Sequence, residues 1–264
     1  MLPDKNSAQT AWKNCIPPVL VFLAALGAWQ ILMSQHVLPP SMFPTPRQVA
    51  KGFGEEMHSG RLYTDIIASL WRVVVGFTLS VLVALPAGIA LGQSSLLRSA
   101  FMPALNFLRC LSPLAWIGFA ILWFGVGDNS AIFLIFLSLV FPIALSVSTA
   151  VLSIPPLYYR VAKELGLSQW EKLNQVILPA IMPGLITTLR VAMGVGWLVV
   201  VAAEMTAGNS GLGFAIYDDR NALRQDLLVV HMIVIGIIGL LLDRMLAGIA
   251  SMPSVQWGYQ QTNL

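Results

Sequence analysis

The 264-residue chain is poor in charge: only 10% of its residues are Asp, Glu, Lys or Arg, whereas 57% are hydrophobic. Soluble globular proteins carry about 25% charged residues. This shortage excludes an ordinary soluble domain and indicates an integral membrane protein. The net charge of +3 is small, and the basic residues form no dense cluster, so nothing indicates a nucleic-acid partner.

Metal ligands and catalytic groups are also scarce. The two cysteines, Cys15 and Cys110, lie in or beside apolar segments, which predicts packed thiols and not a disulfide. His36, His58 and His231 lack metal-ligand spacing, and no Ser/His/Asp or paired-carboxylate constellation is evident. No G-x-x-x-x-G-K-[ST] motif occurs around any lysine. We therefore expect no enzyme activity, no metal, no cofactor and no nucleotide site in this chain.

Long apolar runs are what the sequence has in abundance. About 20 apolar residues span a hydrocarbon core of roughly 30 Å, and six runs of about this length lie at residues 16–33, 69–92, 100–126, 131–152, 181–206 and 227–242. No small-residue cleavage site follows the first run, so we favour a retained helix over a signal peptide. We predict an all-α integral membrane protein with about six transmembrane helices, built as a tail at 1–15, a single transmembrane domain at 16–250 and a tail at 251–264.

Prolines and small residues predict irregular features within these runs. Pro103 and Pro113 are expected to break the third run, so that its first part forms a separate interfacial helix. Pro86 is expected to kink the second run. Small residues recur every four positions in that second run, a ladder that predicts close helix packing: Gly76, Ser80, Ala84 and Gly88.

A polar stretch at 155–179, called the elbow below, joins the fourth and fifth runs and reads PPLYYRVAKELGLSQWEKLNQVILP. Its two leading prolines suit a helix start, where a missing N–H costs nothing. Leu157, Val161 and Leu165 recur every four residues and form a narrow apolar stripe. Gly166 comes next, in the C′ position that tolerates a left-handed backbone. The pattern predicts a short helix with a fixed end.

A second helix is expected within two residues of that glycine. Ser168 and Glu171 have the S-x-x-E spacing of a capping box. We expect this helix to end at Leu178, because Pro179 stops it. The two short helices then form a rigid corner. The alternative is an ordinary amphipathic linker helix.

The elbow resembles the cytoplasmic EAA loop of ABC importer permeases, whose pattern is E-A-A, three residues, Gly, nine residues, Ile, one residue, Leu-Pro. The aligned residues here are Arg160, Val161, Ala162, Gly166, Val176, Leu178 and Pro179. Arg160 departs from the pattern, because it stands where the family has Glu. The resemblance implies that the first helix of the elbow, with its stripe, sits in a groove of an ATPase subunit and transmits its motion.

Three further stretches resemble the nitrate/sulfonate/taurine branch of these permeases. They are SLWRVVVGF at 69–77, SPLAWIGFAILWFGVGDNSAIFL at 112–134 and VAAEMTAGNSGLGFAIYDDRN at 201–221. With the elbow, the likeness covers nearly everything after residue 38. It implies the type I ABC importer permease fold and import of a small anion of the nitrate, bicarbonate, sulfonate or taurine class. The IYDDRN run followed by LLLDR leans towards nitrate and bicarbonate.

The resemblance also implies partners and a place in the cell. We expect two ABC ATPase subunits, an extracytoplasmic solute-binding protein and a second permease subunit, which forms a homodimer or a pseudodimer with this chain in the bacterial inner membrane. Because the chain has no P-loop motif, ATP must bind to another subunit if transport is driven by ATP.

Ionisable residues within apolar runs are costly in lipid and are default functional candidates. Arg72 begins the second run, Arg190 lies in the fifth, and Glu204 lies towards the far end of the fifth. Arg190 and Glu204 are separated by about 21 Å and close to four helical turns, so they share a helix face. That face is a candidate lining of the translocation pathway, together with Met193, Trp197 and Val201. Alternatively, Arg190 snorkels to the interface and Glu204 forms a structural bridge with Arg72.

The glycine-rich segment at 208–213 predicts a tight re-entrant turn, and contact with a small anion or the binding protein is the alternative. Nine of the fifteen Lys and Arg residues fall on the side of the elbow, which favours that side as cytoplasmic. We therefore predict that both termini and Ser168 are cytoplasmic, whereas Ser59 and Asn209 face outward.

Two other classes of membrane protein compete with this prediction. A secondary transporter driven by an ion gradient would have inverted repeats and ion sites at the midplane, and no repeat is evident. A membrane scaffold without a transport role would have no use for proline-bearing spans and a rigid elbow. ATP-dependent uptake into vesicles that contain the partners distinguishes the three.

Overall fold

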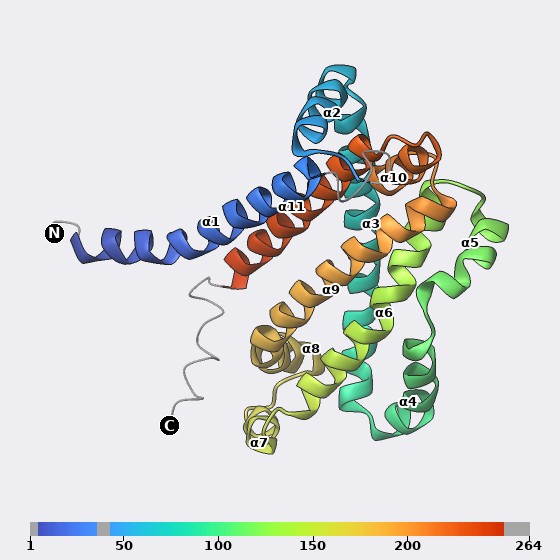
Figure 1. Ribbon diagram of the computed structural model, residues 1–264. Helices are drawn as coiled ribbons and strands as arrows, with labels where there is room; N and C mark the ends of the chain where they lie inside the picture. Colours follow the sequence, from blue (N-terminus) through green and yellow to red (C-terminus); the bar gives the residue numbers. More distant parts are fainter. Residues whose placement is uncertain (1–4, 36–42, 251–264) are drawn as a thin grey trace.

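The computed structural model describes residues 5–35 and 43–250, and every regular element in these ranges is a helix (Figure 1). In chain order the elements are α1 (Lys5–Ser34), α2 (Pro46–Ser59), α3 (Arg61–Gln93), α4 (Ser95–Cys110), η1 (Pro113–Trp116), α5 (Ile117–Phe124), α6 (Asp128–Leu152), α7 (Pro156–Glu164), α8 (Gln169–Lys172), η2 (Leu173–Ile177), α9 (Leu178–Ala207), α10 (Leu212–Asn221) and α11 (Gln225–Ala250). The helix α1 extends into the predicted tail at 1–15, and the predicted tail at 251–264 lies outside the described residues.

The long helices match the apolar runs. Within the described residues, four helices are long and apolar enough to cross a membrane: Arg61–Gln93, Asp128–Leu152, Gln169–Ala207 and Gln225–Gly248. The pair of α4 with η1 and α5 makes a fifth if it is one broken span, and Leu23–Ser34 within α1 is a shorter apolar helix. The predicted all-helical membrane fold is confirmed, with a helix count that agrees only approximately.

The third run is broken at one proline and not at two. The helix α4 continues through Pro103, whereas the chain bends by 90° between Cys110 and Pro113. The prediction of a break at Pro103 was therefore wrong. Pro113 occupies the first position of η1, where its missing N–H leaves no hydrogen bond unmade. Pro86 also lies inside a helix, the uninterrupted α3.

The predicted stop at Pro179 was also wrong, because α8, η2 and α9 form one continuous apolar helix of 39 residues. A proline within an α-helix lacks an N–H and clashes with the carbonyl four residues earlier, which here belongs to Gln175. That carbonyl lies in η2, a π-helical turn in which the Leu178 N–H donates to the Leu173 carbonyl. The wider turn changes the hydrogen-bond register just before the proline, so the helix continues.

The predicted ladder of small residues on α3 is buried against α6. A Cβ atom at Gly76 would lie 2.8 Å from the Cβ of Ile135, and one at Gly88 would lie 2.6 Å from the Cβ of Val147. Only glycine permits this approach. Because the partners advance together along both helices, α3 and α6 run in the same direction, and α4 and α5 carry the chain back between them. The prediction of close packing is confirmed.

Two short helices lie at the end of the bundle where α3 begins (Figure 1). The helix α2 begins with a capping box that Thr45 and Gln48 form. The helix α10 was not predicted, since its sequence has no clear apolar period. It packs against α3, α9 and α11, so tertiary contacts hold it in place.

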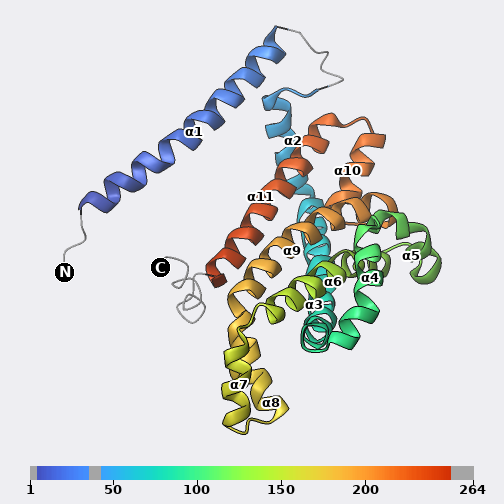
Figure 2. The ribbon, with the colours of Figure 1, turned by 90° about the horizontal axis from the view of Figure 1, so that it is seen from below.

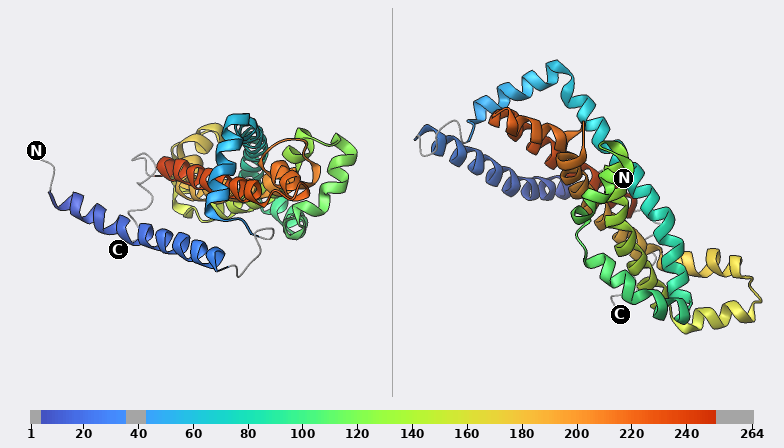
Figure 3. Two further views of the ribbon diagram at one scale, coloured as in Figure 1. Left: turned by 45° about the horizontal axis from the view of Figure 1, so that its top comes forward. Right: turned by 90° about the vertical axis from the view of Figure 1, so that its right-hand side faces the viewer.

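The two ends of the molecule are clearly separated. The helices α2 and α10 lie at one end, called the α10 end, and α7 and α8 lie at the other, called the elbow end (Figure 1). The helices α6, α9 and α11 form the body between them, with α3 behind. The helix α1 lies along α11 in the view of Figure 1, but Figures 2 and 3 place it apart from the body.

We expect a cysteine placed at Asn209 or Ser59 to react with an impermeant thiol reagent added to intact cells, and one placed at Gln169 in the elbow to react only after lysis. All three positions are exposed. Each cysteine is introduced into a variant that lacks Cys15 and Cys110. The physical reason is that the structure puts these sites at opposite ends of the spans. Labelling of Gln169→Cys in intact cells would show that the elbow faces outward and that the predicted topology is wrong.

Candidate functional site: a buried ion pair and an exposed elbow

Arg72 on α3 is a buried charge, only 1% exposed. Its Nε and Nη2 atoms donate to Oδ1 of Asp128 at 2.8 and 2.6 Å, and its Nη1 donates to Oε1 of Glu204 at 2.6 Å. Nη1 and Nη2 also donate to the carbonyl and the hydroxyl of Ser210, at 2.6 and 2.7 Å. A buried ion without partners loses several kcal/mol of hydration free energy. Here three separate segments supply the acceptors.

Glu204 on α9 is 0% exposed and is equally well bonded. Its Oε2 accepts hydrogen bonds from the Ser69 hydroxyl at 2.8 Å and from the Gly213 N–H at 2.9 Å. The Ser69 oxygen in turn accepts from the Leu212 N–H at 2.9 Å. The two carboxylate oxygens therefore join α3, α9 and the start of α10 in one network.

The turn between α9 and α10 covers this network. Gly211 has a φ of +101° and donates its N–H to Oδ1 of Asp65 at 2.9 Å. A Cβ atom at Gly211 would lie 2.5 Å from Cδ of Glu204 and 2.6 Å from Nη1 of Arg72. Both the backbone angle and the available space therefore require glycine. The glycine-rich segment forms the expected tight turn, and in this chain it packs over an ion pair.

Of the two interpretations that the sequence left open for Glu204, the bridge with Arg72 is confirmed. The role of Asp128 was missed. It is the first residue of α6, where a carboxylate is favoured by the helix dipole, and an acid between two apolar runs was the signal that pointed to it. Its side chain is 56% exposed, so it is the accessible member of a buried cluster.

The other charge of the fifth run also has a partner. Nε and Nη2 of Arg190 donate to the two carboxylate oxygens of Asp243 on α11, at 2.6 and 2.7 Å. Trp197 donates its Nε1–H to the Ile235 carbonyl at 3.0 Å. This face of α9 therefore contacts α11, and its role in lining a pathway stays a prediction. Two other residues of the predicted pathway face lie on the same helix: Met193 is buried and Val201 is half-buried.

A second buried polar group lies at the α10 end. Nδ1 of His231 lies 2.7 Å from Oδ2 of Asp219, and Nε2 lies 3.9 Å from Oε2 of Glu56. All three residues are buried, and they join α11, α10 and α2. In the part of the chain that the structure describes, no group of His, Cys, Asp or Glu residues is arranged to hold a metal ion.

At the opposite end, the elbow has the geometry that its sequence predicts. Gly166 has a φ of +68°. Its N–H donates to the Lys163 carbonyl at 3.1 Å, and the Leu167 N–H donates to the Ala162 carbonyl at 3.0 Å. These are the two hydrogen bonds of a Schellman C-cap. No atom lies within 4 Å of an ideal Cβ at Gly166, so the backbone angle alone accounts for the glycine.

The second helix of the elbow begins with the predicted capping box. The Glu171 N–H donates to Oγ of Ser168 at 3.3 Å, and the Ser168 N–H donates to Oε2 of Glu171 at 2.8 Å. Local hydrogen bonds therefore fix both the exit of α7 and the start of α8. The backbone geometry predicted for the corner is confirmed.

The elbow presents its apolar stripe to the outside. Leu157, Val161 and Leu165 are 66%, 45% and 70% exposed, whereas Ala162 is 3% exposed and faces the protein. Arg160 is exposed beside the stripe. An apolar row with a polar rim is typical of an interaction surface. The other two residues predicted here lie half-buried in the first turn of α9: Leu178 and Pro179.

We expect Glu204→Gln to lower the free energy of unfolding by about 3–5 kcal/mol, because it leaves the buried Arg72 charge uncompensated. The matched change Asp128→Asn also removes a carboxylate that pairs with Arg72, but at an exposed position. We expect it to lower the free energy of unfolding by about 1 kcal/mol or less. Thermal unfolding of the detergent-solubilised variants measures both. Equal losses would contradict the central role of the buried pair. In a double-mutant cycle, Arg72→Gln with Glu204→Gln should lose less than the sum of the single changes.

We expect Gly211→Ala to destabilise the protein by about 1–3 kcal/mol more than Gly60→Ala, because only the first change overpacks the ion pair. Gly60 is the matched control: its φ is +74°, and nothing lies within 4 Å of its ideal Cβ. The same unfolding assay measures the difference. Equal destabilisation would mean that backbone strain alone, and not contact with Arg72 and Glu204, fixes glycine at 211.

The chain matches known proteins along most of its length. Residues 76–250 match the family described as "Binding-protein-dependent transport system inner membrane component". The nitrate import permease protein NrtB of Leptolyngbya laminosa is 34% identical over 90% of this chain and 88% of its own. The bicarbonate transport system permease protein CmpB of Synechococcus elongatus is 38% identical over 92% of each chain. The taurine transport system permease protein TauC of Escherichia coli is 34% identical over 83% and 81%.

The fold has a solved counterpart. A chain of the MetNI methionine ABC transporter, in an inward-facing conformation, matches with a TM-score of 0.58 at 20% identity, over 71% of this chain and 95% of its own. At this identity the likeness concerns the fold alone. The family description implies a binding protein and an ATPase as partners in general, and the family itself is not catalytic. The chain belongs to the inner-membrane components of binding-protein-dependent transport systems, and it is a multi-pass permease subunit of the ABC importer type.

Proposed function

We propose that this chain forms the translocation pathway of an ATP-driven importer for a small anion of the nitrate, bicarbonate, sulfonate or taurine class. The relatives named above support this proposal, because nitrate, bicarbonate and the sulfonate group of taurine are all small oxyanions. In this proposal a second copy of the chain completes the pathway, and an external binding protein delivers the anion. The chain does no covalent chemistry and holds no cofactor.

ATP binds and is hydrolysed in a separate subunit, in our proposal. Two features support this division of work. The sequence has no P-loop motif, and the elbow offers an exposed apolar stripe on a rigid corner, where a moving partner can push. The observation that carries the coupling role is the Schellman cap at Gly166 followed directly by the capping box at Ser168. It fixes the direction of α7 relative to the long helix that starts at α8.

Reconstitution tests the proposed function. Proteoliposomes that contain this chain and its ATPase, with binding protein and an anion outside and ATP inside, should accumulate nitrate, bicarbonate or taurine. Uptake that needs an ion gradient and no ATPase would instead support a secondary transporter. Absence of uptake under both conditions would support a scaffold. The mass of the detergent-solubilised assembly reports whether two copies of the chain are present.

We expect Gly166→Val to insert and fold normally but to abolish transport and the response of ATP hydrolysis to loaded binding protein. A β-branched residue in the left-handed region costs about 1–2 kcal/mol, which redirects α7 and its stripe. Gly166→Asn is the matched control, because Asn tolerates this region and the structure leaves open space for its side chain. We expect Gly166→Asn to stay near wild type in both assays.

The two variants separate the possible outcomes at this position. Co-purification with the ATPase and hydrolysis rates with and without binding protein measure coupling directly. Wild-type behaviour of Gly166→Val would show that force does not pass through the elbow. Equal, severe losses in both variants would mean that the left-handed angle is not what the glycine provides.

A further inference from the structure

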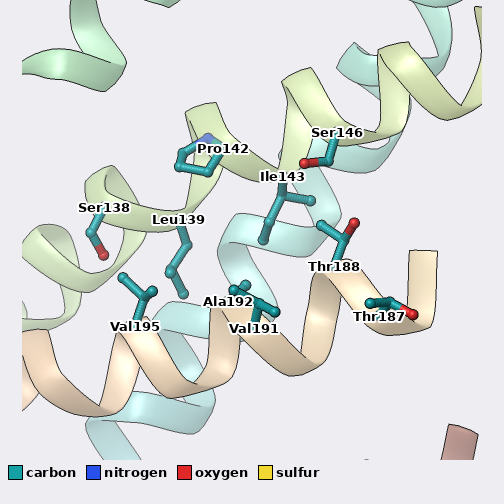
Figure 4. Close-up of a pocket in the computed structure, with 10 residues that line it drawn as sticks. All are labelled: Ser138, Leu139, Pro142, Ile143, Ser146, Thr187, Thr188, Val191, Ala192 and Val195. Carbon is teal, nitrogen blue, oxygen red and sulfur yellow. The ribbon is translucent and has the colours of Figure 1, made fainter. Parts of the chain in front are cut away.

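A pocket of about 250 Å³ lies between α6 and α9 (Figure 4). None of the residues that line it belongs to the ion pair or to the elbow. Ser138 and Ser146 line it from α6, and Thr187 and Thr188 line it from α9. At 1.5 Å per residue, Ser146 lies about 27 Å along α6 from its start, and Thr188 lies about 28 Å from the end of α9 at the same side. The two hydroxyls are therefore level with each other, about 9 Å from the elbow end of α6.

The four hydroxyls differ in their hydrogen bonds. Ser138 donates to the Ile135 carbonyl at 2.7 Å, and Thr187 donates to the Pro183 carbonyl at 3.2 Å. A hydroxyl in a membrane-spanning helix commonly donates its hydrogen to a backbone carbonyl of the preceding turn in this way. Within the described chain, the hydroxyls of Ser146 and Thr188 have no such partner. They are the two that face each other across the pocket (Figure 4).

Lipid cannot satisfy these groups, so the pocket must face either other protein or water. Ser146 is exposed and Thr188 half-exposed on the surface of this one chain. An unpaired hydroxyl in hydrocarbon is costly. Pro142 also lines the pocket, and because it has no N–H, the Ser138 carbonyl lacks its usual helical donor. Backbone groups of this kind are tolerated at membrane depth only in protein or beside a water-filled cavity.

We propose that this pocket is a transit site in the translocation pathway, where the hydroxyls of Ser146 and Thr188 donate hydrogen bonds to a passing small oxyanion. The inference rests on the anion import proposed above and assigns residues to it. Both hydroxyls can rotate to point their hydrogen at an anion. None of the ten residues that line the pocket is charged, so no carboxylate repels the anion and no cation traps it.

The size and chemistry of the pocket suit brief binding of a small solute. Pockets for drug-sized ligands measure about 300–1,000 Å³, and this one is smaller, with room for an ion of a few atoms and some of its water. Conduction requires binding that is strong enough to admit the ion and weak enough to release it. Two neutral donors provide that balance, whereas a bidentate arginine would hold the anion.

The test removes the two hydroxyls and compares uptake with ATP hydrolysis in the reconstituted transporter. In Ser146→Ala with Thr188→Val we expect anion uptake at saturating binding protein to fall by about two- to tenfold per hydroxyl. ATP hydrolysis should stay within about twofold of wild type, since the elbow is untouched. The matched control, Thr149→Val with Thr206→Val, removes one hydroxyl from each of the same helices outside the pocket and should leave uptake unchanged.

An added negative charge and a cysteine-labelling experiment complete the test. Ser146→Asp should reduce uptake of nitrate, bicarbonate and taurine further, because a carboxylate repels each anionic group. A cysteine at Ser146 should react with a charged, water-soluble thiol reagent, whereas one at the exposed apolar Leu240 of α11 should not. Wild-type uptake in the Ser146/Thr188 double variant, or an unreactive Ser146→Cys, would overturn the proposal. So would uptake and hydrolysis that fall in parallel, because that marks a structural defect.

Failure of the proposed anion import can be distinguished from failure of the transit site. If the wild-type assembly hydrolyses ATP but imports none of the three anions, the anion assignment itself is wrong, and the transit site is overturned with it. If wild type imports an anion and the Ser146/Thr188 variants match it, only the transit site is wrong.

Discussion

The constraint on which the rest of this structure depends is the buried guanidinium of Arg72. A cation removed from water inside a bundle of apolar helices must be matched by acceptors, or it costs several kcal/mol. Asp128 at the start of α6, Glu204 near the end of α9 and the turn before α10 supply them. Because each comes from a different part of the chain, satisfying this one group aligns three long helices at the α10 end.

The elbow follows the opposite logic. Its hydrogen bonds are local, within a dozen residues, and they fix a corner whose apolar side chains point away from the protein. At the α10 end, polar contacts between distant residues stabilise a buried charge. At the elbow end, contacts between neighbouring residues hold an apolar stripe in an exposed position. The helix that runs from Gln169 to Ala207 connects the two. It passes through the π turn before Pro179 and carries Glu204 in its last turn, so one continuous helix links the elbow to the ion pair.

Between these ends, the bundle combines close packing with a polar gap. Glycines on α3 let α6 approach until no larger residue fits, which makes that contact rigid. The contact between α6 and α9 instead leaves a pocket with hydroxyls and a proline. The proposed transit site therefore lies next to a tightly packed helix pair. Arg190 and Asp243, with Trp197, brace α9 against α11 on its other face.

The sequence by itself determined the features that rest on short-range rules. These are the apolar runs, the ladder on α3, the Schellman cap at Gly166 and the capping box at Ser168, because hydropathy and backbone preference act within a few residues. It also pointed to a family through the pattern of the elbow. Only the tertiary structure decided which charges pair, since Asp128 and Arg72 are 56 residues apart along the chain. It decided too that Pro179 would not stop a helix, that α10 would form, and that hydroxyls from α6 and α9 would line one pocket, because packing between distant segments outweighs local preference at those places.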